Sequence, residues 1–98
     1  MPEPAPKSKR LKSERIQDAI LKVPAWQLEG QTIRRTYKLP GFRAALAFVQ
    51  FVGELAEARD HHPDIDIRYN KVTLTLTTHS AGGLTEKDFD LAGLIDCG

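Results

Sequence analysis

Three histidines are the residues best suited to chemistry in this 98-residue chain. His61 and His62 follow a helix-like stretch, and His79 follows an alternating run that ends at Thr78, so all three flank one predicted hairpin. An imidazole has a pKa of about 6.5, so it can accept or donate a proton near neutral pH without special tuning. The arrangement favours a proton-transfer site over three solvated surface side chains.

Two other kinds of site are less well supported. Three histidines could bind zinc, but adjacent histidines on an extended segment diverge, and no helical His pair or cysteine completes a zinc pattern. Ser80 next to His79 lacks a nucleophile-elbow motif, and Cys97 lies at a chain end, where fixed geometry is rare. We expect no metal and no cofactor, which leaves an acid–base site or a small-ligand site.

The composition is ordinary for a soluble globular domain. Fourteen Lys and Arg against thirteen Asp and Glu leave a net charge of +1, so nucleic acid is not expected as a partner. No apolar run approaches the ~20 residues of a membrane span, and we expect no membrane association. The single cysteine excludes an intramolecular disulfide and favours a cytoplasmic location.

A tail is expected before the folded part of the chain. Residues 1–12 hold three prolines among several basic residues, a composition that cannot bury enough apolar surface to order itself. We therefore interpret residues 1–12 as a disordered, basic, Pro-rich tail and residues 13–98 as a single domain.

The first elements of the domain are predicted as a helix and two strands. Ser13 is placed to cap a helix that Pro24 stops. Strands are expected at 26–29 and 32–39, joined by a turn at Gly30.

The segment Phe42–Arg59 carries the strongest helix signal and more apolar surface than one helix face requires. Its apolar residues form two neighbouring stripes: Phe42, Ala45, Leu46, Val49, Val52 and Ala56 in one, and Ala44, Ala47, Phe48, Phe51 and Leu55 in the other. A sheet in so small a domain can cover one stripe, so the second should pack on another subunit. We expect a homodimer or homotetramer formed through helix 42–59 and a sheet edge.

A second hairpin is predicted beside the histidines. Strands at 65–69 and 72–78 would be joined by the two-residue turn Asn70-Lys71, so that paired residue numbers sum to 141. That register puts the apolar side chains on one face and extends to pair His62 with His79 on the polar face. Opposed Cβ atoms lie about 4.5–5.5 Å apart, close enough for two imidazoles to address one small ligand.

A last helix is expected over residues 86–95. Thr85 is its N-cap, and Asp88 is the reciprocal partner in a capping box. The order α-β-β-α-β-β-α predicts an α+β domain, a four-stranded antiparallel sheet with three helices on one face.

The spacing of these residues resembles a known family signature. The motif consists of Glu57-x-x-x-His61-His62-Pro63, Tyr69-Asn70-Lys71-Val72, Thr77-Thr78-His79 and Gly83-Leu84-Thr85-Glu86-Lys87-Asp88. It is similar to the signature of the pterin-4a-carbinolamine dehydratases over more than 30 residues. The Trp26-x-Leu28 strand, the central helix and the closing Leu91-Ala92 helix also stand where the family has them.

The resemblance implies a hydro-lyase that dehydrates 4a-hydroxytetrahydrobiopterin to quinonoid dihydropterin, as in tetrahydrobiopterin recycling after an aromatic amino-acid hydroxylase. One base removes the N5 proton and one acid protonates the departing hydroxyl, so no cofactor is required. By the family pattern, His61 and His79 are the acid–base pair, His62 binds and polarises the substrate, and Asp88 orients a histidine or only caps the helix.

The resemblance also assigns residues around the substrate. Those expected to contact the pterin are Glu57, Asp60, Thr77, Thr78 and Ser80. Many relatives carry an aromatic residue where this chain has Ile65, so ring stacking there is absent or comes from elsewhere.

The family also includes binding proteins, among them transcription coactivators and assembly factors. A non-catalytic role of that kind is therefore the alternative to the enzyme. Because the assembly factors tend to lose the histidine set, the three histidines favour the enzyme.

Overall fold

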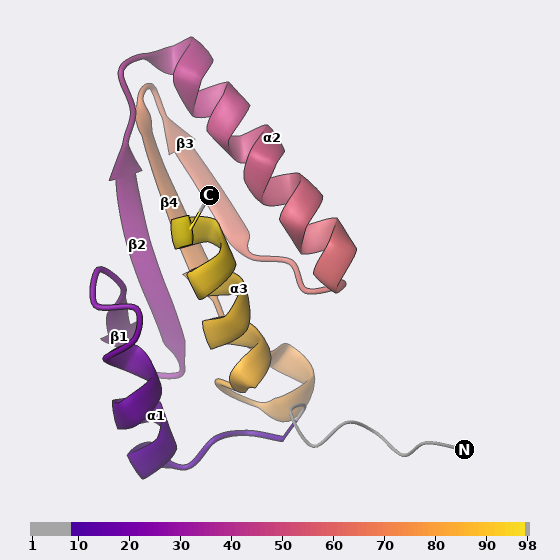
Figure 1. Cartoon of the computed structure of the whole chain (residues 1–98). Helices are drawn as coiled ribbons and strands as arrows, with labels where there is room; N and C mark the ends of the chain where they lie inside the picture. The colour runs from indigo at the N-terminus through magenta and orange to yellow at the C-terminus, as the bar shows by residue number, and fades with distance from the viewer. Residues whose placement is uncertain (1–8, 98) are drawn as a thin grey trace.

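The computed structural model describes residues 9–97, and the predicted order of elements is confirmed (Figure 1). The elements are α1 (Ser13–Ile20), β1 (Gln27–Glu29), β2 (Thr32–Lys38), α2 (Phe42–Arg59), β3 (Asp64–Arg68), β4 (Lys71–Leu76), a 3-10 turn (His79–Ala81) and α3 (Glu86–Cys97). None of the helices in this part of the chain is long and apolar enough to cross a bilayer.

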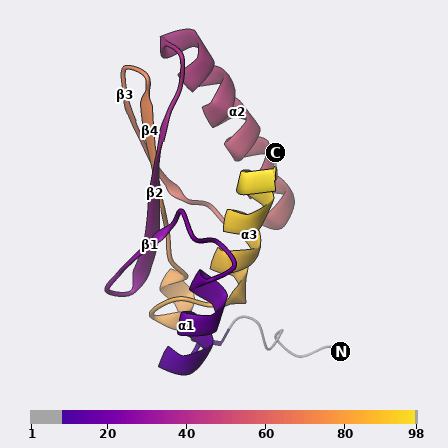
Figure 2. The same cartoon turned by 60° about the vertical axis from the view of Figure 1, so that its left-hand side comes forward.

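The strands form one antiparallel sheet in the order β1-β2-β4-β3, and the helices lie on one of its faces (Figure 2). Strand β4 alternates as expected for a sheet covered on one side, with Val72, Leu74 and Leu76 fully buried and the threonines between them partly exposed. The predicted α+β fold is therefore confirmed, with the core between this face and the helices.

The predicted register of the second hairpin is wrong by two residues. Strands β3 and β4 pair Ile65 with Leu74 and Ile67 with Val72, so paired numbers sum to 139 and the turn is Tyr69-Asn70. A shift of two leaves every side chain on its predicted face, so the apolar alternation could not distinguish the two registers.

A tertiary contact accompanies the observed register. The backbone N–H of Leu39 donates to the carbonyl of Asn70 at 2.8 Å, and the Asn70 side chain donates to the carbonyl of Leu39 at 2.9 Å. These bonds tie the hairpin turn to the end of β2. Strand β4 then ends at Leu76, and the predicted pairing of His62 with His79 across the ladder does not form.

The start of the domain also differs from the prediction. Ser13 is the first helical residue of α1 rather than its cap, because Lys12 occupies the N-cap position. Of the predicted tail, residues 1–8 lie outside the described residues. Its last part packs on the domain, since Leu11 N–H donates to the Leu84 carbonyl at 2.8 Å and Arg10 donates to the Gly82 carbonyl at 3.4 Å.

Helix α2 has the predicted bounds, and neither of its stripes is wholly covered. Ala45, Val52 and Ala56 are buried, whereas Phe42 and Leu46, from the same stripe, are 49% and 47% exposed. The second stripe is mostly half-buried. The subunit contact expected here stays a prediction.

Asp96 connects the end of α3 to the sheet. Together with Trp26, Arg35 and Tyr37 it forms what we call the Asp96 cluster. Its carboxylate accepts hydrogen bonds from Trp26 Nε1 at 3.0 Å, from Arg35 at 2.8 Å and from the Tyr37 hydroxyl at 2.6 Å. The Arg35 guanidinium also stacks over the Tyr37 ring, 4.2 Å from its centroid. Helix α3 therefore ends beside the sheet, and it runs two residues beyond its predicted end at Ile95.

Candidate active site

The first turn of α3 is held by the predicted capping box. Thr85 Oγ1 accepts the backbone N–H of Lys87 at 3.2 Å, and Asp88 Oδ2 accepts the backbone N–H of Thr85 at 2.9 Å. Both Thr85 and Asp88 are fully buried. The position of the Asp88 carboxylate is therefore set by the start of the helix.

The same carboxylate contacts a histidine. Asp88 Oδ1 lies 2.6 Å from His61 Nε2, and Asp88 Oδ2 also accepts the hydroxyl of Thr78 at 2.9 Å. The two roles considered for Asp88, helix cap and partner of a histidine, are thus both filled, one by each oxygen. A short hydrogen bond between a buried carboxylate and an imidazole is an arrangement that orients a proton-transferring histidine.

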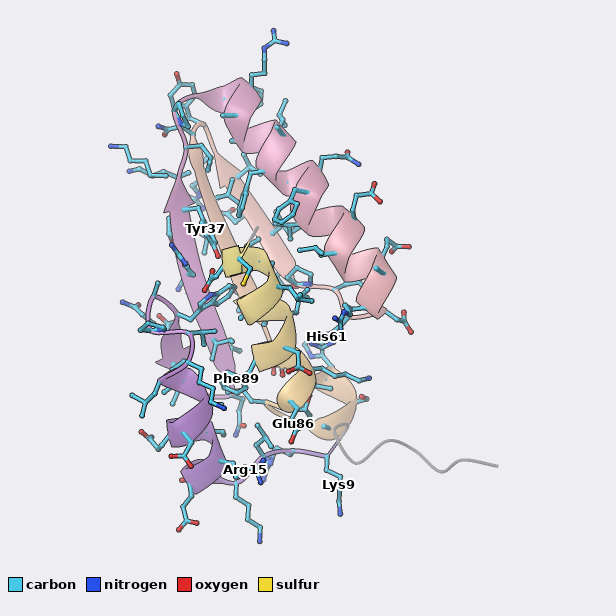
Figure 3. The ribbon with its side chains drawn as sticks, in the orientation of Figure 1. Lys9, Arg15, Tyr37, His61, Glu86 and Phe89 are labelled. Atoms are coloured by element: carbon cyan, nitrogen blue, oxygen red, sulfur yellow. The ribbon has the colours of Figure 1, made fainter. Side chains whose placement is uncertain are left out.

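His61 reaches Asp88 because the chain reverses at the end of α2. Asp60 adopts the left-handed conformation, with φ of 51°, which Asp tolerates better than most residues because its short side chain can bond locally. The next backbone N–H, that of His61, donates to the Ala56 carbonyl at 3.1 Å. The imidazole consequently lies between the last turn of α2 and the first turns of α3, where it is only 9% exposed (Figure 3).

The other two histidines are exposed. His62 Nε2 lies 2.7 Å from Glu57 Oε2 in a pair whose side chains are 56% and 78% exposed. His79 begins the 3-10 turn after β4. Among the described residues, no three His, Cys, Asp or Glu side chains form a group that could hold a metal ion.

The remaining predicted site residues differ in whether their side chains already form hydrogen bonds within the protein. The Thr77 hydroxyl donates to the Gln31 carbonyl at 2.7 Å, and the buried Thr78 hydroxyl is engaged with Asp88 and Thr85. Asp60 and Ser80 are exposed beside His61 and His79, respectively. The structure therefore brings together His61, Asp88 and Thr78, and leaves the other predicted residues on the surrounding surface.

A small cavity of about 130 Å³ borders His61. Its lining consists of Arg59, His61, Lys87, Asp90 and Leu91, so His62 and His79 do not contribute to it. Sequence reasoning missed Arg59 and Lys87 as site residues, although they stand two positions before His61 and one before Asp88. A larger cavity of about 560 Å³ lies between α1 and α3 and contains none of the predicted site residues.

Thr85 was predicted only as a helix cap, and the fold also brings its hydroxyl next to that of Thr78. Its hydroxyl lies 2.8 Å from the Thr78 hydroxyl. The capping-box spacing with Asp88 was the signal that could have placed it near the histidines.

Comparison with known proteins identifies the family. A family model described as pterin 4 alpha carbinolamine dehydratase matches residues 9–97. A Chloroflexus aurantiacus protein named "Putative pterin-4-alpha-carbinolamine dehydratase" is 59% identical over 87 residues, covering 89% of this chain and 94% of the relative. A protein of the same name from a Roseiflexus species is 56% identical over 87 residues, with the same shares covered.

A solved structure supports the same assignment. The transcriptional coactivator/pterin dehydratase from Brucella melitensis superposes with a TM-score of 0.86 at 34% identity, covering 91% of this chain and 97% of that one. The chain therefore belongs to the pterin-4a-carbinolamine dehydratase family.

Proposed function

We propose that this protein is a hydro-lyase that eliminates water from a 4a-hydroxytetrahydropterin, such as 4a-hydroxytetrahydrobiopterin, to give the quinonoid dihydropterin. The observation that carries the proposal is the buried His61–Asp88 pair, 2.6 Å long, at the edge of a cavity. Family membership supports the same chemistry.

The reaction needs two proton transfers and no change of oxidation state. A base takes the proton from N5, the C4a–O bond breaks, and an acid protonates the departing hydroxyl, which leaves as water. His61 and His79 are the proposed acid–base pair, and no metal or cofactor takes part in this scheme. An aromatic amino-acid hydroxylase is the class of enzyme that would supply the substrate.

The exposed residues are assigned to substrate binding. His62, braced by Glu57, would polarise the pterin, while Asp60, Thr77, Thr78 and Ser80 contact it through their backbones or free side chains. The cavity beside His61 is smaller than the roughly 300 Å³ at which ligand pockets usually begin. We infer that the pterin ring extends from this cavity over the neighbouring surface that carries the other histidines.

Purified protein should accelerate the disappearance of authentic 4a-carbinolamine. His61→Ala and His79→Ala should each lower kcat by a factor on the order of 10² or more, because each removes a proton-transfer group. Lys38→Gln, on the uncovered face of the sheet, is the matched control and should keep wild-type activity. Wild-type protein that does no better than buffer would rule out the dehydratase.

A non-catalytic role in binding another protein is the second candidate, because the exposed apolar part of α2 that would pair two copies of this chain could take a helix of a different protein instead. Phe42 and Leu46 are about half exposed, as is usual for a surface that another chain covers. We propose that a second copy covers them, through α2 and a sheet edge, giving a homodimer or homotetramer in the cytoplasm. Light scattering should show an oligomer that Leu46→Asp dissociates, and a wild-type monomer at micromolar concentration would contradict this.

A further inference from the structure

The hydroxyls and amides around Asp88 form a chain in which the direction of every hydrogen bond follows from one premise, that Asp88 is an ionised carboxylate and therefore only accepts. It begins at an obligatory donor, because a backbone N–H, that of Lys87, donates to Thr85 Oγ1 at 3.2 Å. It ends at His61, 2.6 Å from Asp88 Oδ1. Each intermediate hydroxyl has one proton to give, so assigning one bond assigns the next.

The two threonines complete the chain. Thr78 Oγ1 donates to Asp88 Oδ2 at 2.9 Å, so its one proton is used. The 2.8 Å contact between the two hydroxyls must therefore be a bond from Thr85 to Thr78. Asp88 Oδ2 thus receives two donors, the Thr78 hydroxyl and the Thr85 backbone N–H, the latter at 2.9 Å.

With Oδ2 satisfied in this way, Asp88 presents Oδ1 to the histidine as an acceptor. An ionised Asp88 can only accept at Oδ1, so the imidazole nitrogen 2.6 Å away is the donor, which places the proton of neutral His61 on Nε2. The side chains that link Lys87 to His61, those of Thr85, Thr78 and Asp88, belong to residues at most 5% exposed, so solvent does not compete for the bonds between them.

The other ring nitrogen remains accessible. Among residues 9–97, Nδ1 of His61 has no hydrogen-bond partner. In the same part of the chain, every side-chain nitrogen or oxygen that is fully buried does have a partner. Nδ1 must therefore be reached by solvent, although the residue as a whole is only 9% exposed. The cavity lined by Arg59 and Lys87 lies against this same side chain.

We propose that Thr78 and Thr85 are positioning residues that hold Asp88 so that neutral His61 carries its proton on Nε2 and presents Nδ1, as a proton acceptor, to the substrate. The part that concerns the substrate rests on the proposed function, whereas the tautomer of His61 does not. Thr78 thus acts through Asp88 and His61 rather than by direct contact of its hydroxyl with the pterin.

Nitrogen-15 NMR of the imidazole rings tests the tautomer without any substrate. At a pH where His61 is neutral, wild-type protein should show the proton on Nε2, with the signals assigned through His62→Gln and His79→Gln. Asp88→Asn should reverse this. The amide oxygen must face the Thr85 N–H and the Thr78 hydroxyl, so its NH₂ faces Nε2 and pushes the ring proton to Nδ1.

Steady-state kinetics of the dehydration are the second part of the test. Asp88→Asn should lower kcat by a factor on the order of 10³ to 10⁴, the loss expected of a correctly placed imidazole in the wrong tautomer. Thr78→Val should lower kcat about tenfold with KM unchanged, and Thr78→Ser, which restores the hydroxyl, should recover the wild-type rate. Circular dichroism confirms that each variant is folded.

The proposal is overturned if wild-type His61 carries its proton on Nδ1, if Asp88→Asn leaves the tautomer unchanged, or if Thr78→Ser is as slow as Thr78→Val. An inactive wild-type protein whose His61 still shows the Nε2 tautomer would refute the dehydratase while leaving the hydrogen-bond chain standing. An active protein whose His61 carries its proton on Nδ1 would support the dehydratase and refute the hydrogen-bond chain.

Discussion

Removing the carboxylate of the Asp96 cluster should destabilise the domain far more than its partly exposed position suggests. In Asp96→Ala the indole N–H of Trp26, a residue only 2% exposed, loses both of its contacts to Asp96. A buried donor left without a partner costs about 1–3 kcal/mol.

The other partners contribute less, because water can replace part of what they lose. The Arg35–Asp96 pair has side chains 29% and 23% exposed and is worth at most about 1 kcal/mol. The Tyr37 hydroxyl loses a hydrogen bond to a charged group, worth about 1 kcal/mol once partial exposure is allowed for. An acid in the last turn of a helix opposes the macrodipole, so its removal returns about 0.5 kcal/mol.

We therefore expect the free energy of unfolding to fall by about 1.5–4.5 kcal/mol, which at roughly 4–8 °C per kcal/mol for a domain of this size lowers Tm by roughly 6–36 °C. Urea unfolding should be followed by far-ultraviolet circular dichroism rather than by tryptophan fluorescence. Trp26 is the one tryptophan of the chain, and its surroundings differ between the variant and the wild type, so its fluorescence would change for reasons other than unfolding.

Asp90→Ala is the matched control, because it makes the same side-chain change on the same helix at a residue for which no hydrogen bond or ion pair is found among the described residues. The difference in unfolding free energy between the two variants reports the lost contacts of the Asp96 cluster, because both variants replace Asp by Ala in the same helix. If Asp96→Ala unfolds within about 0.5 kcal/mol of Asp90→Ala, the argument from the buried indole donor is refuted.

Three further outcomes follow from the geometry. Burial, and then the hydrogen bond with Asp96, raise the pKa of Tyr37, so wild-type stability should fall as pH rises above the unfolded tyrosine value of about 10, and urea titrations of Tyr37→Phe should lack that component. Mutation of Gly82, with φ of 76°, to Ala should lower the free energy of unfolding by about 1–2 kcal/mol in a thermal unfolding assay, because residues with a Cβ rarely adopt this backbone conformation. Glu57→Gln should change the unfolding free energy by less than about 0.5 kcal/mol, because its pair with a histidine is exposed, so a larger change in denaturant titrations would mean that the pair is structural.

The Asp88 carboxylate links stability to the proposed chemistry. It caps α3 through Oδ2 and contacts His61 through Oδ1, so one buried group serves both the fold and the site. Variants of Asp88 will change both properties at once, which is why the tautomer of His61 is a more specific readout than the rate alone.

Several elements could be predicted because their signals are local. Helix α2 has the predicted bounds, since eighteen residues of helical periodicity follow a Pro-Gly pair. The capping box at Thr85 and Asp88 was also visible, because it needs only two residues at a fixed spacing. The alternation of β4 predicted correctly which side chains face the core.

The failures came where two distant segments decide together. The observed hairpin register brings Asn70 into hydrogen bonds with Leu39, 31 residues away, and no alternation reveals such a contact. The predicted pairing of His62 with His79 failed with it. Ser13 was misplaced by one position, an error common at helix ends, because a cap depends on backbone angles rather than on residue type alone.

The sequence by itself determined the family, the order of the elements, the faces of the strands and the three histidines as the candidates for proton transfer, because periodicity and motif spacing are properties of the chain. Only the tertiary structure decided which histidine is buried and what it touches. His61 meets Asp88 across 27 residues, because the reversal at Asp60 and the start of α3 bring them within 2.6 Å. A directional hydrogen bond requires both partners to be placed in space, and residue spacing alone cannot supply that.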